Sequence, residues 1–416
     1  YKSLSQKNNY TEGTGKYRNN KKYNFTSYIM DQGITFEKKV MKLITKKFKS
    51  ERIIEIHGEL DPRNPEKVKE TLDAMRKGIP IIHSGVLHNP KNKTYGIPDL
   101  LVRSDWLKFL VDDNPIDKKD ENKPAPKLHT DNIRCEWHYR VVDIKFTGLT
   151  LRADAKHILN SGSFPAYKSQ LLIYNWALGN LQGYTPDQVY ILGRRWKYMA
   201  KGETFIGNNC FDKLGIINYK TIDHKYINET KKAIKWLREV RSNKASKWNI
   251  LKYPLSRWEL YPNMCNNHDY PWHDIKDKIS KDNKELTSLW MVGPRNRNIA
   301  LNSGISQWTH TLCNPKMLGI KGEKTGRTLQ KIISINRNKK TKILPKYINN
   351  NIGGWKEANN IEFFVDFETC NGAVSNIKGL PFSNNENILF MIGVGYIDPA
   401  TNIWIYKDFT VNKLNF

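Results

Sequence analysis

The sequence predicts an α/β fold class with a separate helical region in its middle. Segments with strand character alternate with helical patterns from about residue 29 to residue 225. From about residue 226 to 338 the pattern is helical, and three apolar strand segments follow after residue 355. We therefore expect a basic flexible arm over residues 1–28, a first domain over 29–225, a helical region over 226–350 and a partial domain over 355–416.

The first predicted elements are two helices. In GITFEKKVMKLITKKF, apolar residues recur at the three- and four-residue spacing of a helix face, namely Phe36, Val40, Leu43 and Ile44. A second helix is expected over residues 65–77, because a proline stands at its start and Gly78 and Pro80 stand at its end.

Strands then alternate with a helix. Three segments combine apolar and β-branched residues in the manner of strands, namely IPIIHSG, GIPDLLVRSDWLKFL and CEWHYRVVDIKFTGL. Residues 111–131, between the last two, are polar and rich in proline, which predicts a long exposed insertion on a hairpin. AYKSQLLIYNWALGNLQG predicts an amphipathic helix that ends at a glycine, and QVYILGRRWKY predicts a further strand.

The charge balance indicates a polyanionic partner. Lys and Arg total 68 against 41 Asp and Glu, a formal net charge of +27. Such a surplus favours nucleic acid, with DNA as the first expectation, over a neutral or acidic partner. No membrane association is expected, because the longest nearly uncharged apolar run, residues 388–397, is about half of a bilayer span. The alternative is a basic surface without a specific partner, and no protein partner can be named.

The cysteines predict an intracellular setting. Five cysteines lie far apart and form no C-x-x-C spacing, which favours reduced thiols and argues against a zinc finger or a secreted disulfide scaffold. We therefore expect the protein in the cytoplasm or nucleus.

Two acids and a lysine are predicted to converge. Asp99 follows a Gly-x-Pro turn at the start of a strand, and Asp143 and Lys145 are two residues apart on the next strand, so they share one face. Carboxylates hold Mg²⁺ or Mn²⁺, which activates water and neutralises a scissile phosphate, while a lysine stabilises developing negative charge. The carbonyl of Ile144 is a further candidate ligand. The alternative is a turn acid beside a surface ion pair.

Three more residues favour a catalytic site. Glu37 lies on the first predicted helix and can supply a third acid. Gln170 and Tyr174 are four residues apart on the helix after the Asp143 strand, so they share one helix face and suit contact with a nucleic-acid strand end. The alternative for this pair is a helix face packed on the sheet.

Four short motifs resemble, in their chain order, those of the PD-(D/E)XK nucleases of the RecB and lambda-exonuclease branch. They are GITFE, GIPD, VDIK and QLLIY, and the resemblance covers about residues 31–200. The resemblance implies a restriction-endonuclease-like core that hydrolyses DNA phosphodiester bonds, as an exonuclease or at ends and flaps. It implies metal ligation by Glu37, Asp99 and Asp143, a catalytic Lys145, and substrate contact by Gln170 and Tyr174. The gap of 44 positions between the two aspartates departs from the pattern, and the insertion accounts for it. Some relatives hold an iron–sulfur cluster, but Cys265 has no near neighbour, so none is expected here.

The C-terminal strands suggest a second, incomplete site. EFFVDFET presents Asp366 and Glu368 on one strand face, and MIGVGY follows as the next strand. Over residues 360–416 this resembles the first motif of DEDD exonucleases, which implies a truncated RNase H-like sheet that lacks the family's further aspartates. The alternative is a core strand with incidental acids.

The middle region contains a candidate phosphate-binding element. LWMVGPRNRNIALNSGI is similar to a helix–hairpin–helix, which would use Gly293 for a tight turn and Arg295 and Arg297 to contact a nucleic-acid backbone. The alternative is an ordinary helix turn.

Three functions follow from these patterns. The first is a metal-dependent DNA nuclease with its site at Asp99, Asp143 and Lys145. The second is a non-catalytic nucleic-acid-binding scaffold that keeps a nuclease fold. The third is a DEDD-type exonuclease whose active site a missing C-terminal part completes.

Overall fold

The computed structural model describes residues 25–58, 61–129, 135–242, 248, 250, 255–267, 269–338, 354, 357, 361–370, 379–382 and 388–411. Residues 24–237 and 360–416 form one compact unit, and residues 238–359 belong to the other. The division falls inside helix α7 (Lys225–Arg241), which begins where the sequence predicts a domain boundary. The predicted arm lies outside the described residues up to residue 24, and residues 25–28 already belong to a helix.

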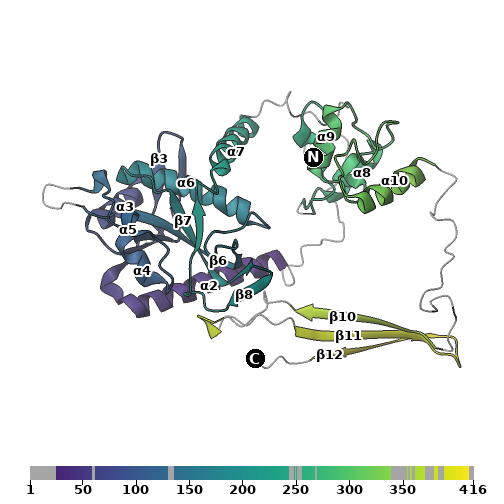
Figure 1. Ribbon diagram of the computed structural model, residues 1–416, viewed down its shortest axis with the longest axis horizontal. Helices are drawn as coiled ribbons and strands as arrows, with labels where there is room; N and C mark the ends of the chain where they lie inside the picture. The colour runs from purple at the N-terminus through teal and green to yellow at the C-terminus, as the bar shows by residue number, and fades with distance from the viewer. Residues whose placement is uncertain are drawn as a thin grey trace. The chain divides into compact units, whose positions relative to one another are not determined.

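The first unit is built on a mixed sheet that includes β6, β7 and β8 (Figure 1). The sheet has seven strands in the order β1-β2-β5-β6-β7-β8, and β9 also pairs with β7. The strands are β1 (Ile53–Glu55), β2 (Ile81–His83), β5 (Leu100–Arg103), β6 (Tyr139–Thr150), β7 (Gln188–Ala200), β8 (Glu203–Gly207) and β9 (Gly215–Asn218). The β1–β2 and β6–β7 pairs are parallel, whereas β5 runs antiparallel to β2 and β6. The predicted α/β class is confirmed, and the finer fold family stays a prediction.

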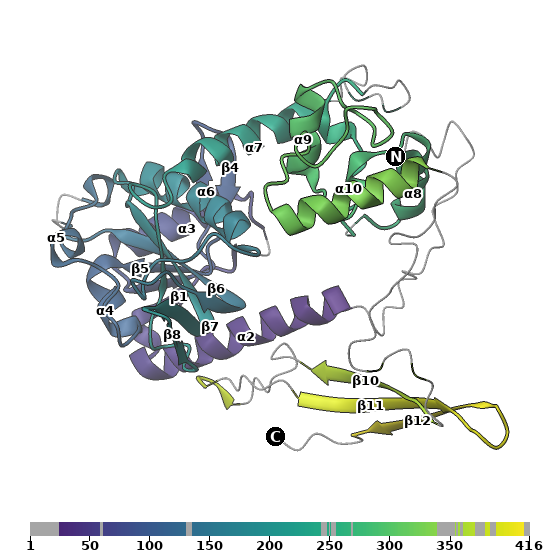
Figure 2. The same cartoon turned by 45° about the vertical axis from the view of Figure 1, so that its right-hand side comes forward.

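Helices cover both faces of this sheet. Helix α2 (Phe25–Phe48) buries Phe36, Val40 and Ile44 in a core cluster with Val142 and Ile144 of β6. Helix α6 (Phe164–Gln182) buries its leucines in a second cluster that includes Val141 of the same strand. Figure 2 shows α2 and α6 on opposite sides of the sheet. Because both faces are covered, β6 buries apolar residues on each side, with Val141 in one cluster and Val142 and Ile144 in the other.

The helix ends follow local sequence signals. Helix α3 (Pro65–Arg76) begins after Asn64, whose side chain accepts a hydrogen bond from the Glu66 amide at 2.9 Å. It ends before Gly78, whose φ of +69° is the left-handed conformation that favours glycine. The predicted helix over residues 65–77 is confirmed to within one residue.

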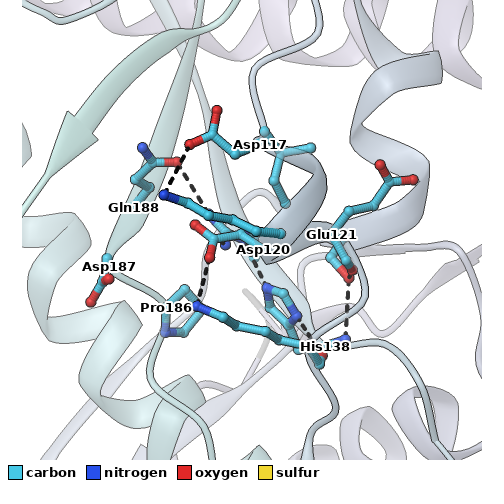
Figure 3. Close-up of polar contacts among 12 residues, drawn as sticks. Asp117, Asp120, Glu121, His138, Pro186, Asp187 and Gln188 are labelled. Atoms are coloured by element: carbon cyan, nitrogen blue, oxygen red, sulfur yellow. Dashed lines mark hydrogen bonds and ion pairs between the residues drawn. The ribbon is translucent and has the colours of Figure 1, made fainter.

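The segment between β5 and β6 is an insertion on an antiparallel strand pair, as the sequence predicts, but it is only partly exposed. It contains helices α4 (Leu107–Leu110) and α5 (Lys118–Glu121), and it buries Ile116, Ala125 and Leu128. Part of the segment lies beside a buried arginine of β6. Arg140 donates hydrogen bonds to His138, Gln188 and Tyr190, and Asp120 of the segment lies 3.9 Å from its guanidinium. Figure 3 shows Asp120, His138 and Gln188 in this network.

Some short elements differ from the prediction. The strand predicted over GIPDLLVRSDWLKFL ends at Arg103 and continues as helical turns. The hairpin of β3 (Leu87–Asn89) and β4 (Thr94–Gly96) was not predicted, and neither were β1, β8 and β9. These strands are three to five residues long, which leaves little periodicity to detect.

The second unit is helical in its described part, as predicted. It contains α8 (His273–Asp282), α9 (Pro294–Asn302) and α10 (Glu323–Arg337). Its core gathers Leu286, Val292, Ala300, Leu318, Leu329 and Ile333. Across the described part of the chain, each helix is either too short or too polar to cross a lipid bilayer.

The three C-terminal strands are confirmed as β10 (Phe363–Cys370), β11 (Ile388–Ile397) and β12 (Trp404–Thr410). They form a separate antiparallel sheet with β11 in the centre. Many of its aromatic side chains are exposed, among them Phe363, Phe367 and Trp404. Among the described residues, no helix covers this sheet in the way that helices cover the seven-stranded sheet.

Candidate active site

Strand register brings Asp99 and Asp143 side by side. In the antiparallel β5–β6 pair, Leu100 lies opposite Val142, so the residue before β5 faces the residue after Val142. Asp99 Oδ2 accepts a hydrogen bond of 2.6 Å from the amide of Ile144, which fixes its carboxylate beside Asp143. The Asp99 carboxylate thus reaches across to β6 from the turn that precedes β5.

Lys145, on the same strand as Asp143, joins Asp99 and Asp143 in one group of charged side chains. Its Nζ lies 2.5 Å from Asp143 Oδ2 and 5.5 Å from the ring centroid of Tyr167 on α6. Asp143 is buried, and apart from this ion pair its Oδ2 has no hydrogen-bond partner among the described residues. Tyr167 is not among the residues predicted from sequence, although it lies one helical turn before Gln170 and therefore shares its helix face.

The electrostatics of the group favour an added cation. Burial, and then the neighbouring Asp143 carboxylate, raise the pKa of Asp99 well above its usual value, although Lys145 partly opposes this. Burial alone would lower the pKa of Lys145, but the Asp143 and Asp99 carboxylates outweigh it and raise that pKa. Two carboxylates in a low-dielectric site therefore share one ammonium, which leaves negative charge under-compensated.

Glu37 lies at the edge of this group. It comes from α2, and its charge contributes to the raised pKa of Asp99. Its Oε1 lies 3.4 Å from His83 Nε2, and His83 Nδ1 lies 3.2 Å from Glu55 Oε1. The third acid thus faces a histidine bridge at the ends of β1 and β2.

Gln170 and Tyr174 cover the group from α6. Gln170 Nε2 donates a 2.8 Å hydrogen bond to the Tyr174 hydroxyl. Burial and the Asp143 charge raise the pKa of Tyr174 to about 12, so the hydroxyl stays protonated and can donate. The Tyr174 ring lies directly on Gly96, where a Cβ would come within 2.1 Å of it. Gly96, at the end of β4 and three residues before Asp99, therefore leaves the space that this ring fills.

Asp99 and Asp143 fit a hard divalent cation. Among the described residues, no three His, Cys, Asp or Glu side chains are arranged so that they could hold a metal ion together. Proteins commonly hold Mg²⁺ through one or two carboxylates, however, with substrate phosphate and water completing its octahedron. Asp143 Oδ2, which is buried and is held by the ion pair with Lys145 alone among the described residues, supplies the oxygen donor that such an ion prefers. Glu37, turned toward His83, is the predicted ligand that this arrangement supports least.

The other predicted residues lie elsewhere. Asp366 and Glu368 are exposed on β10. Gly293 has an ordinary φ of −94°, and the preceding turn has its positive φ of 63° at Met291, so this turn does not require a glycine at position 293. Contact of Gly293 with a nucleic-acid backbone stays a prediction. Arg297 is buried and donates to the carbonyls of Trp258, Tyr261 and Pro262, so the fold itself occupies its guanidinium. Arg295 is exposed on α9 and stays a candidate for phosphate contact.

A hollow in the helical unit does not add to this site. It has a volume of about 490 Å³ and is lined by Ser256, Arg257, Trp258, Glu259, Arg297 and Asn298. Arg257 is already paired with Glu239 and Glu259. The charged groups of the hollow are therefore engaged within the unit.

Comparison with models of known protein families gives no match to this chain, and no curated protein matches it either.

Proposed function

We propose that this protein is a divalent-metal-dependent nuclease that hydrolyses DNA phosphodiester bonds, with a PD-(D/E)XK core and activity at strand ends or flaps. The observation that carries the proposal is the meeting of Asp99, Asp143 and Lys145 on neighbouring strands beneath α6. The net charge of +27 supports a polyanionic substrate. An intracellular setting is part of the same proposal.

Each residue has a role that follows from its position. Asp99 and Asp143 would hold Mg²⁺ or Mn²⁺, which supplies charge neutralisation at the phosphate and an acidified water. Lys145 Nζ, fixed beside Asp143, stabilises negative charge as it develops on the phosphate. Gln170 and the protonated Tyr174 hydroxyl are placed to donate hydrogen bonds to a strand that lies over the carboxylates.

A cleavage assay tests the proposal. End-labelled linear and circular DNA, both single- and double-stranded, would be incubated with Mn²⁺ and either the wild-type protein or Lys145→Ala. We expect the wild type to degrade linear DNA and Lys145→Ala to be at least about 100-fold slower, the scale of losing one charge-stabilising group. Lys118→Ala, which removes an exposed lysine of the same unit, is the matched control and should cleave like the wild type. Equal activity of all three proteins would refute the assignment.

A second function, a non-catalytic nucleic-acid-binding scaffold, is favoured by the lack of a three-ligand cluster among the described residues. Calorimetric titration with Mn²⁺ separates the two functions. A nuclease should bind the ion in the wild type and lose that binding in Asp143→Asn. A scaffold should bind DNA with no specific uptake of Mn²⁺.

A further inference from the structure

We infer that the ribbon formed by the end of β7 and by β8 is a stacking platform for the bases of a single-stranded nucleic-acid end, with Phe205 as the residue on which a base stacks. This inference rests on the proposed function and names the form of substrate that the site receives. The observation behind it is a stack of three aromatic rings that has no role in the proposed hydrolysis.

The ribbon extends directly from the catalytic strand pair. Lys145 of β6 lies opposite Gly193 of β7, and Trp196 is three residues further along β7. At about 3.3 Å per residue, Trp196 lies on the order of 10 Å further along the strands than Lys145 and its partner Gly193. A strand that crosses the carboxylates can therefore reach the ribbon within a few nucleotides.

Three rings on the ribbon form one nearly parallel stack. The rings of Trp196 and Tyr198 have centroids 5.9 Å apart and planes inclined by 18°, and those of Tyr198 and Phe205 have centroids 4.8 Å apart and planes inclined by 12°. Tyr198 and Phe205 are direct partners in the β7–β8 register, so the strand pairing holds the stack in place.

One end of the stack is closed. The Trp196 ring lies over Gly207, where a Cβ would come within 2.1 Å, and its Nε1 donates to Asp212 Oδ2 at 2.8 Å. Lys213 Nζ lies 4.4 Å from the centroid of the same ring. Phe205 stands at the other end and is 39% exposed. A flat nucleobase can extend the stack beyond Phe205 in the geometry that aromatic rings already adopt here.

The charges around the stack complement a phosphate backbone. Residues 194–213 contain five cationic side chains and two acidic ones, and one of the acids, Asp212, is bound to Trp196. Arg195 packs across Gly148 of β6, and its buried Nη1 has no hydrogen-bond partner in the described part of the chain. Aromatic rings beside cations are the combination that binds single strands, because the bases of a duplex are already stacked and paired.

A binding experiment tests the platform without hydrolysis. Fluorescence anisotropy in EDTA would compare a labelled 20-nucleotide oligothymidine with an abasic oligonucleotide of equal length and charge. We expect the wild type to prefer oligothymidine by about 5- to 20-fold, the scale of one stacked base. Phe205→Leu keeps apolar bulk without a flat ring, and it should reduce the preference to less than about 2-fold while abasic binding stays unchanged.

Two further variants make the experiment decisive. Phe205→Trp enlarges the ring and should keep or increase the preference for bases. Ile206→Ala, a matched control on the exposed neighbouring residue, should behave like the wild type. If Phe205→Leu keeps the wild-type preference, or if Phe205→Trp loses it, the platform is refuted.

The outcomes separate this inference from the proposed nuclease. If Lys145→Ala abolishes cleavage but Phe205→Leu keeps its preference for bases, the nuclease stands and the platform fails. If no variant or wild-type sample cleaves DNA but Phe205→Leu loses the preference, the platform stands and the nuclease fails. Thermal melting of Phe205→Leu within a few degrees of the wild type shows that the fold is intact.

Discussion

Strands β6 and β10 carry the same local pattern, a pair of charged side chains two residues apart in an apolar strand. On β6, Asp143 is buried between two helix-covered faces and is paired with Lys145. On β10, Asp366 and Glu368 are exposed, and so are the aromatic residues around them. The same spacing therefore produces a buried charge cluster in one sheet and solvated acids in the other.

The difference shows that the neighbouring strand and the helices over the sheet decide whether such a pair of charged side chains is buried or solvated. Asp143 has a second carboxylate, Asp99, from the strand beside it, whereas the partner of Asp366 in the register is Gly393. Charges interact strongly only where protein has replaced water. Catalytic chemistry is therefore expected at β6 and not at β10 as it stands.

The largest expected effect separates the two strands by activity. Asp143→Asn should slow Mn²⁺-dependent cleavage at least about 100-fold, because a neutral amide neither holds the cation nor orients Lys145. Asp366→Asn makes the same chemical change on β10 and should leave the rate within about twofold. Initial rates on end-labelled DNA would measure both, and the reverse pattern would place catalysis in the C-terminal sheet.

The second effect compares two glycines that face equal steric conflict. A Cβ at Gly96 would lie 2.1 Å from the Tyr174 ring, and a Cβ at Gly395 would lie 2.1 Å from the Trp404 ring. Tyr174 is held by α6, so Gly96→Ala should destabilise the fold by about 2–3 kcal/mol and reduce cleavage. Trp404 is exposed and can swing away, so Gly395→Ala should cost less than about 1 kcal/mol.

Hydrogen exchange resolved by peptide would measure the opening free energy of β6 and of β10 in both variants. A similar loss of opening free energy in the two variants would mean that the two sheets are packed alike, which would contradict the difference in their burial.

The third effect is a pH dependence of stability, which is expected in the seven-stranded sheet and not in the C-terminal sheet. Burial and the Arg140 charge lower the pKa of His138 to about 3, so this imidazole stays neutral in the fold. In the unfolded chain it takes up a proton below its ordinary pKa of about 6.5, so stability is lost as the pH falls through that value toward 3. Between pH 7 and pH 5 the loss should be about 2 kcal/mol.

Exchange protection of the β6 peptide at the two pH values, corrected for intrinsic rates, measures this loss. His138→Gln keeps one donor for the Lys123 carbonyl and one acceptor for Arg140 but does not titrate. An equal slope in His138→Gln would assign the pH dependence to other groups.

The smallest effect has the opposite sign. Asp99→Asn keeps an oxygen for the Ile144 amide but removes one of two like charges, so in EDTA it should raise stability by about 1 kcal/mol. Asp366→Asn, at an exposed position, should not change stability. Thermal melting with and without Mn²⁺ measures both, and added Mn²⁺ should stabilise the wild type but not Asp99→Asn.

The meeting of Asp99, Asp143 and Lys145 was predictable because strand alternation and a hairpin connection are visible in sequence. The helix face that carries Gln170 and Tyr174 was predictable for the same reason, since its periodicity runs over many residues. These features depend on local geometry, which a single sequence records well.

Long-range pairing was not predictable. Residues 111–131 look solvated because they are polar, but Asp120 turns inward to meet the buried Arg140, which no spacing reveals. Arg297 looks like a phosphate ligand because it follows a Gly-Pro turn, but three backbone carbonyls hold it inside the helical unit. In each case a distant partner decides whether a charge faces water, and pattern analysis does not see that partner.

The ion pair between Lys145 and Asp143 also bears on how the protein matures. The ammonium acts as an internal counter-ion, so the carboxylates can assemble during folding without waiting for a metal. A newly made chain would thus be complete in shape yet inactive wherever free Mg²⁺ or Mn²⁺ is scarce. If the protein is the nuclease proposed above, supply of the ion, and not refolding, would then start degradation of DNA.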